Sequence, residues 1–162
     1  MKVFDEATAA FLASGCALII GTVDDHGQPH AGRGWGLDVI PSADGVSASV
    51  RLLLDADDDI TVANVASRGA VAVTATSVRS LSSTQLKGRA ISTEVVTLGD
   101  QARAERYRED FFADIFETDG TDPSLLARLT PAGHVACTIA VDEVFDQTPG
   151  PGAGAALSPG RS

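Results

Sequence analysis

Two cations and several hydroxyl groups are concentrated in the segment RSLSSTQLKG, residues 79–88. Proteins bind a phosphate monoester through charge-assisted donors from Arg or Lys, together with short neutral donors from Ser or Thr. The segment could therefore bind a phosphate, and Arg79 and Ser80 are its candidate ligands. A solvated turn with ordinary surface residues would have the same composition, so both interpretations stay open.

Gln85 and Lys87 lie two residues apart in this segment. On a strand, residues with this spacing point to the same side. An amide beside an ammonium group suits the polar edge of a heterocycle that presents carbonyl acceptors and an N–H. Gly88 follows and adds no side chain that could block a ring. In the alternative, both side chains face solvent on the outside of a barrel.

A second candidate is the glycine-rich segment HAGRGWG, residues 30–36. Glycines within a strand indicate a bend or a close approach of a ligand or another backbone. Arg33 lies among them and is either a ligand contact or a surface residue. Trp35 is the single tryptophan of the chain. A lone tryptophan more often packs in a core or a subunit interface than it serves as a platform for a ligand.

The acidic run at residues 55–59 begins like a calcium-binding loop. Such a loop requires Gly at its sixth position and Glu at its twelfth, where this sequence has Ile60 and Ala66. Helix capping and solvation explain the run instead. The three histidines have no spacing typical of a metal site, so we expect no bound metal.

The pattern of apolar residues divides the chain into strands and helices. Helices are expected over residues 4–14, 60–68 and 100–117, with a further short helix at 123–129, and strands over 17–23, 30–40, 46–54, 70–78, 84–96 and 134–145. Strands joined mostly by short turns predict an α+β fold built around an antiparallel barrel or sheet.

Composition and charge restrict the class of protein. With 162 residues, of which 44% are hydrophobic, the chain fits one domain with a core. A net charge of −10 disfavours binding to nucleic acid or to an anionic membrane. No apolar run is long enough to span a bilayer, and the first residues do not form a signal peptide. We therefore expect a soluble, cytoplasmic protein in which Cys16 and Cys137 are buried thiols.

In their order, these segments resemble the pyridoxamine 5'-phosphate oxidase-like FMN-binding family. The resemblance is carried by FLASGCALIIGTVDDHGQPHAGRGWG, ITVANVASRGAVAVTAT, TQLKGRA and QTPGPGAG. It implies a split β-barrel with flanking helices over residues 1–147, working as a homodimer with FMN in a cleft between the subunits. Residues 148–162 are rich in Gly, Pro, Ala and Ser and are expected to form a mobile or surface-lying tail.

The resemblance also assigns roles to individual residues. Gln85 matches the glutamine that contacts the isoalloxazine ring, and Lys87 is a nearby contact. Thr61 and Asn64 lie on the helix that borders the phosphate. Arg51 could retain one phosphate contact, although the segment that is basic in authentic oxidases, here VRLLLDADDD, is acidic after it. The oxidases' closing Trp and Arg are also missing, since Arg161 lies in the tail, and both departures argue against oxidation of vitamin B6.

The function expected from these features is an FMN-dependent oxidoreductase acting on a small-molecule redox substrate. A flavin-binding carrier or sensor without turnover would need the same cleft. A relative that uses deazaflavin F420 or haem is a further alternative. Haem would require an axial ligand from one of the histidines, Tyr107 or the two cysteines.

Overall fold

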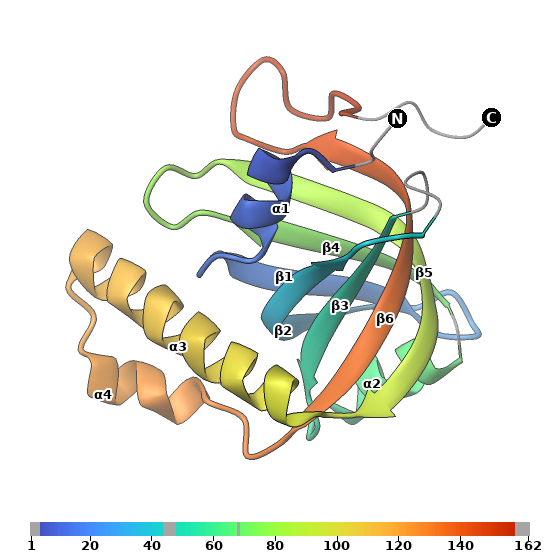
Figure 1. Ribbon diagram of the computed structural model, residues 1–162, viewed down its shortest axis with the longest axis horizontal. Helices are drawn as coiled ribbons and strands as arrows, with labels where there is room; N and C mark the ends of the chain where they lie inside the picture. Colours follow the sequence, from blue (N-terminus) through green and yellow to red (C-terminus); the bar gives the residue numbers. More distant parts are fainter. Residues whose placement is uncertain (1–3, 44–47, 68, 158–162) are drawn as a thin grey trace.

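The computed structural model describes residues 4–43, 48–67 and 69–157, and in this part of the chain six antiparallel strands close into a barrel (Figure 1). Their order around the barrel is β1-β2-β3-β6-β5-β4. The strands are β1 Ala17–Val23, β2 Pro29–Ile40, β3 Ala48–Asp55, β4 Ala70–Thr76, β5 Ser83–Val95 and β6 His134–Asp146. The predicted α+β split barrel is confirmed.

Helices cover the outside of this barrel (Figure 1). They are α1 Glu6–Leu12, α2 Asp59–Ala66, the long α3 Leu98–Asp119 and α4 Pro123–Leu126, which continues into a 3₁₀ turn at Ala127–Leu129. Each predicted element is present. The expected start of one strand at residues 46–47 and the expected end of one helix at Arg68 lie outside the described residues.

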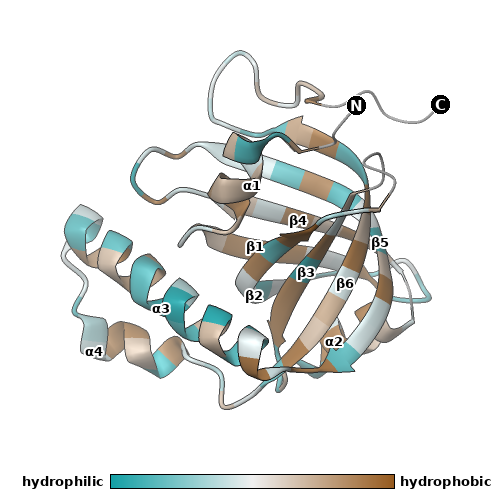
Figure 2. Cartoon of the chain, viewed as in Figure 1, coloured by the Kyte–Doolittle hydropathy of each residue, from teal (hydrophilic) through white to brown (hydrophobic). Residues whose placement is uncertain are grey.

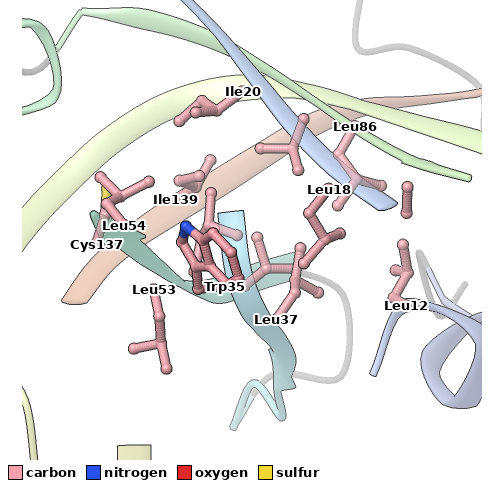
Figure 3. Close-up of a cluster of buried hydrophobic side chains, with 14 of the residues drawn as sticks. Leu12, Leu18, Ile20, Trp35, Leu37, Leu53, Leu54, Leu86, Cys137 and Ile139 are labelled. Carbon is pink, nitrogen blue, oxygen red and sulfur yellow. The ribbon is translucent and has the colours of Figure 1, made fainter. Parts of the chain in front are cut away.

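Apolar residues recur along the strands (Figure 2), and the buried ones among them form the core of the barrel. On β1, Leu18 and Ile20 point inward and are fully buried, while Ile19 points outward and is 43% exposed. This period of two is the geometry of a strand with one face on a core. Figure 3 shows the buried cluster, which includes Leu18, Ile20, Leu37, Leu54, Leu86, Cys137 and Ile139.

Helix α3 packs against the outer side of β2 through aromatic side chains. Tyr107 makes an edge contact with Trp35 at 6.4 Å between ring centroids and stacks on Phe111 at 5.6 Å. Its hydroxyl donates to the carbonyl oxygen of Cys16 at 2.7 Å. Trp35 is only 3% exposed, so the single tryptophan is a packing residue.

The tail folds back onto the end of β6. The backbone N–H of Gly154 donates to Asp146, that of Asp146 to Ala155, and that of Leu157 to Val144, at 2.7 to 2.9 Å. These bonds lie beyond Val141, where β3 ends its pairing with β6. Residues 148–157 therefore form a surface segment held to the barrel, and the rest of the tail, including Arg161, lies outside the described residues.

Both cysteines are buried and free. Burial raises the pKa of Cys16 above its ordinary value and that of Cys137 to about 12, so neither thiol is reactive in the folded protein. Among the helices that the structure describes, none combines the length and the apolar character needed to cross a membrane.

Candidate functional site

The strand register places five outward side chains in one row across the barrel. Arg33 on β2 is paired with Ile19 on β1, which is paired with Thr74 on β4. Thr74 is paired with Gln85 on β5, and Gln85 with Phe145 on β6. The Gln85 side chain donates from Nε2 to Thr74 Oγ1 at 3.1 Å. The amide singled out from the sequence is therefore held on the outer face of the barrel.

A parallel row of very small residues follows two positions further along the strands. Ala31 on β2 is paired with Gly21 on β1, and Gly21 with Ala72 on β4. Ala72 is paired in turn with Lys87 on β5, and Lys87 with Glu143 on β6. Because the first three residues carry at most a methyl group, the side chains of this row project less far from the barrel than those of Ile19 and Gln85.

A cavity of about 440 Å³ lies over these small residues, and we call it the trough. Its floor is formed by Gly21, Ala70 and Ala72. Other residues line the trough from the outer face of the barrel or along its border, namely Val23, Lys87, Gly88, Arg89, Asp142 and Glu143. The trough is thus a flat apolar surface with charged side chains along its β5 and β6 side.

Charges of both signs are available in the trough. The Lys87 ammonium lies 4.7 Å from the centroid of the Phe145 ring, within the range of a cation–π contact. Among the described residues, neither Lys87 nor Arg89 forms an ion pair, and the same holds for Asp142 and Glu143. These four groups can therefore bind a ligand without first breaking an internal salt bridge.

Gly88 has a structural role that its sequence context did not indicate. A Cβ at this position would lie 1.9 Å from the carbonyl oxygen of Ala140 on β6. The pairing of β5 with β6 also shifts register between Lys87 and Gly88. The missing side chain therefore allows the backbone of β6 to approach, rather than clearing space for a ring.

The structure places Arg79 and Ser80 away from the trough. Both lie in the turn between β4 and β5, where Arg79 pairs with Asp114 at 2.6 Å and also with Glu117 on α3. The hydroxyl of Ser80 donates to that of Ser82 at 3.0 Å. The guanidinium expected to bind phosphate is thus already bonded to two carboxylates.

Arg51 is likewise engaged in internal ion pairs. Its Nε and Nη2 donate to the two carboxylate oxygens of Asp100 at 2.9 and 2.8 Å, and its Nη1 donates to Glu94 at 2.7 Å. Asp100 is 2% exposed and caps α3 through Thr97. The hydrogen bonds from Arg51 hold the pKa of Asp100 well below its usual range. This arrangement anchors the start of α3 to β3.

Thr61 and Asn64 are buried between α2 and the barrel. Asn64 donates from Nδ2 to Thr22 Oγ1 at 2.9 Å. A Cβ at Gly32 would lie 2.3 Å from Thr61 Oγ1, which shows how closely the helix approaches β2. Asn64 therefore attaches α2 to the barrel by a hydrogen bond, while Thr61 packs against β2 and its buried Oγ1 has no hydrogen-bond partner among the described residues.

Arg33 lies at a second cavity on the outer face. Its guanidinium carbon is 5.9 Å from the Trp35 ring centroid and 5.6 Å from that of Phe111. The cavity measures about 380 Å³ and is lined by Ile19, His30, Ala31, Gly32, Arg33, Asp55 and Asp58. His30 pairs with Asp58 at 3.2 Å. The two carboxylates make this cavity a poor environment for phosphate.

Gln85 and Lys87 lie on one face of β5, as their spacing predicted, whereas Arg89, Asp142 and Glu143 were not among the predicted site residues. The spacing of two from Lys87 was a signal that could have identified Arg89. The β6 carboxylates carried no such signal, because their proximity depends on strand pairing. Over residues 4–43, 48–67 and 69–157, no cluster of three or more His, Cys, Asp or Glu side chains could hold a metal ion.

The closed antiparallel barrel with helices on its outside and an open, small-residue face is the split-barrel fold. Solved structures share it along most of the chain. HupZ from Group A Streptococcus is 14% identical, with a TM-score of 0.55 and coverage of 94% of this chain and 98% of HupZ. A proposed pyridoxamine 5'-phosphate oxidase from Lactobacillus delbrueckii is 16% identical, with a TM-score of 0.53 and coverage of 90% and 95%.

A protein named F420 reductase has the same fold, with 13% identity, a TM-score of 0.51 and coverage of 87% of this chain and 98% of the reductase. No protein-family model matches the sequence, and no curated protein matches it. The resemblance to split barrels related to pyridoxamine 5'-phosphate oxidase is therefore confirmed at the level of the fold.

Proposed function

We propose that this chain binds FMN in the trough and acts as a flavin-dependent oxidoreductase on a small-molecule redox substrate. The observation that carries the proposal is the small-residue floor at Gly21, Ala70 and Ala72, next to Lys87 and Arg89, two cations that form no ion pair with a described residue. This combination suits a ligand with a planar ring and a negatively charged group.

The lining of the trough fits the parts of FMN. A planar ring can lie directly on strands whose outward residues have no side chain beyond Cβ. The volume of about 440 Å³ is within the usual range of cofactor sites. Lys87 and Arg89 can donate charge-assisted hydrogen bonds to a phosphate. Asp142 and Glu143 would repel a phosphate but can accept hydrogen bonds from the hydroxyls of a ribityl chain.

In this proposal the residues of the chain bind and orient the cofactor, and the bound flavin supplies the electron transfer. Lys87 places a positive charge beside the ring edge, where negative charge develops on reduction. Gln85 lies in the row beside the trough rather than in its lining, and its amide would reach the ring edge only by giving up the hydrogen bond to Thr74. Arg51 and Arg79 are assigned to the internal ion pairs that they form.

We further propose a homodimer in which a second copy covers the trough. The exposed apolar side chains of Ile19, 43% accessible, and Val23, 36% accessible, border this face. Burying them against a partner would stabilise the assembly and exclude water from the ring. The free, buried thiols fit a reducing compartment such as the cytoplasm.

The alternatives differ in how well the trough supports them. Deazaflavin F420 has a planar ring that would use the same floor, and one structural neighbour is named F420 reductase. Haem is supported less, because the described lining of the trough offers no His, Cys, Met or Tyr as an axial ligand. A carrier or sensor would need the same trough, and the absence of turnover would distinguish it.

Titration of the purified chain with FMN tests the proposal directly. We expect saturable quenching of flavin fluorescence. In Gly21→Val, the new side chain points into the trough, and its Cβ would be no closer than 3.8 Å to its nearest neighbour, Ala72 O. The variant should therefore keep its thermal stability and lose FMN affinity by roughly tenfold or more, about 1.4 kcal/mol.

The matched control is Gly152→Val, since a Cβ at that glycine meets no atom within 4 Å and the residue lies outside the trough. Its affinity for FMN should equal that of the unmodified chain. Equal affinity in Gly21→Val would show that flavin does not bind over Gly21. Saturable binding of F420 with no binding of FMN would support the deazaflavin alternative.

A further inference from the structure

A third cavity, of about 270 Å³, lies beneath the N-terminal half of α3 and shares no lining residue with the trough. Trp35 on β2 forms its floor, and the loop at residues 130–133 closes one side. That loop is held in place by the backbone N–H of Ala56, which donates to the carbonyl oxygen of Gly133 at 3.0 Å. The cavity is thus built from three separate parts of the chain.

One face of α3 forms the opposite wall. Gln101, Ala104, Glu105 and Arg108 all line the cavity, and their spacing of three, four and seven residues puts them on the same side of a helix. Ala104 is buried and small, so the helix leaves space above the indole of Trp35. Glu105 is exposed, whereas Arg108 is half-buried.

A cation in this cavity lacks a carboxylate partner. Arg108 forms no ion pair within the described chain. The ring of Trp35, which is 3% exposed, also lines the cavity. The guanidinium of Arg108 has room for an acceptor between the floor and the wall.

His134 is another polar residue of the lining. Burial lowers its pKa below the ordinary value against the opposing effect of Asp55, and the charge of Arg108 acts in the same direction as burial. A neutral imidazole can donate or accept a hydrogen bond. His134 and Arg108 line the same cavity.

We infer that the cavity beneath α3 is a second small-molecule site, which binds a small aromatic carboxylate. The ring lies on the indole of Trp35 between Ala104 and Val96, and the carboxylate accepts from Arg108. Apolar lining with a few converging polar groups is the usual composition of such sites. The site is independent of the trough and does not require bound flavin.

Trp35 is the chain's only tryptophan, so its fluorescence reports on this cavity. Benzoate is the probe, titrated into the full-length chain, with benzylamine as a cationic ring of similar size. We expect a saturable change with benzoate and a much weaker response to benzylamine. Arg108→Gln should raise the benzoate dissociation constant by roughly tenfold or more, because it removes a charge-assisted hydrogen bond.

Arg106→Gln is the matched control, since Arg106 is an exposed residue of the same helix that does not line the cavity. It should bind benzoate as the unmodified chain does. Gly21→Val should also keep the benzoate response, which separates this site from the proposed flavin site. The inference is overturned if benzoate gives no saturable change, if Arg108→Gln binds it unchanged, or if benzylamine binds equally well.

Discussion

The carbonyl oxygen of Ala140 on β6 occupies the space that a side chain at Gly88 on β5 would need. A Cβ at residue 88 would lie 1.9 Å from that oxygen, and the nearest atoms are all backbone. Gly88→Ala should therefore force β5 and β6 apart and lower the free energy of unfolding by about 2 kcal/mol or more. Urea denaturation measures the loss, with Gly152→Ala as the control. Equal midpoints for the two variants would contradict the close approach.

Arg51 is expected to be a stability residue because it neutralises the buried carboxylate of Asp100. Arg51→Met keeps much of the side-chain volume and leaves that carboxylate without its main partner. The free energy of unfolding should fall by about 3 kcal/mol. Arg106→Met, at an exposed position, should have little effect. Arg103 also donates from Nη1 to Asp100 at 3.0 Å. A loss no larger than that of the control would show that Arg103 and Thr97 suffice to hold Asp100.

The same pair predicts the dependence of stability on pH. Hydrogen bonds from Arg51 hold the pKa of Asp100 below its ordinary value of 3.8. A carboxylate with a lowered folded-state pKa stabilises the protein above its unfolded-state pKa, and this stability is lost as pH falls below it. Urea midpoints should thus drop below about pH 4, and the drop should be smaller or reversed in Arg51→Met. Parallel pH profiles for the two proteins would contradict the assignment.

Lys87 should tune the redox potential of a flavin bound in the trough. A positive charge beside the ring favours the reduced, anionic form, so Lys87→Met is expected to lower the midpoint potential. Lys87→Arg keeps the charge and should leave the potential close to that of the unmodified chain. Redox titration of the three FMN complexes measures the effect. Identical potentials in the Met variant would remove Lys87 from the vicinity of the ring.

Arg79 tests whether the turn between β4 and β5 contributes to ligand binding. Its partners Asp114 and Glu117 lie on α3, and the pairs are solvent-exposed. Arg79→Ala should lower the melting temperature only slightly, because exposed ion pairs contribute little, and it should leave FMN affinity unchanged. Marked weakening of FMN binding would instead assign Arg79 to the phosphate, as its sequence context first suggested.

The elements were predictable from the sequence because each has a local pattern of apolar residues, which alternate in β1 and form a continuous buried run at the end of β3. The expected strand at 17–23 coincides with β1, and that at 134–145 ends one residue before β6 does. Such local patterns follow from backbone geometry and need no knowledge of neighbouring strands. Gln85 and Lys87 could be placed on one side of β5 for the same reason.

The partners of the arginines were not predictable in this way. Arg51 meets Asp100 across 49 positions of sequence, and Arg79 meets Asp114 across 35. An arginine among hydroxyl residues has the same local pattern whether it binds phosphate or a distant carboxylate. Only the packing of α3 on the barrel distinguishes the two. The place of Glu143 beside Lys87 likewise depends on the pairing of β5 with β6.

Closure of the barrel has a consequence for how this chain can associate with other polypeptides. Each of the six described strands has a hydrogen-bonded neighbour on both sides, and the returning segment at residues 155–157 pairs with the part of β6 that β3 leaves open. Aggregation often begins when a strand of another chain pairs with an open sheet edge. The described strands of this barrel offer little unpaired backbone for such pairing. Association through the outer face of these strands would instead depend on their outward side chains, such as Ile19 and Val23, which single substitutions can change.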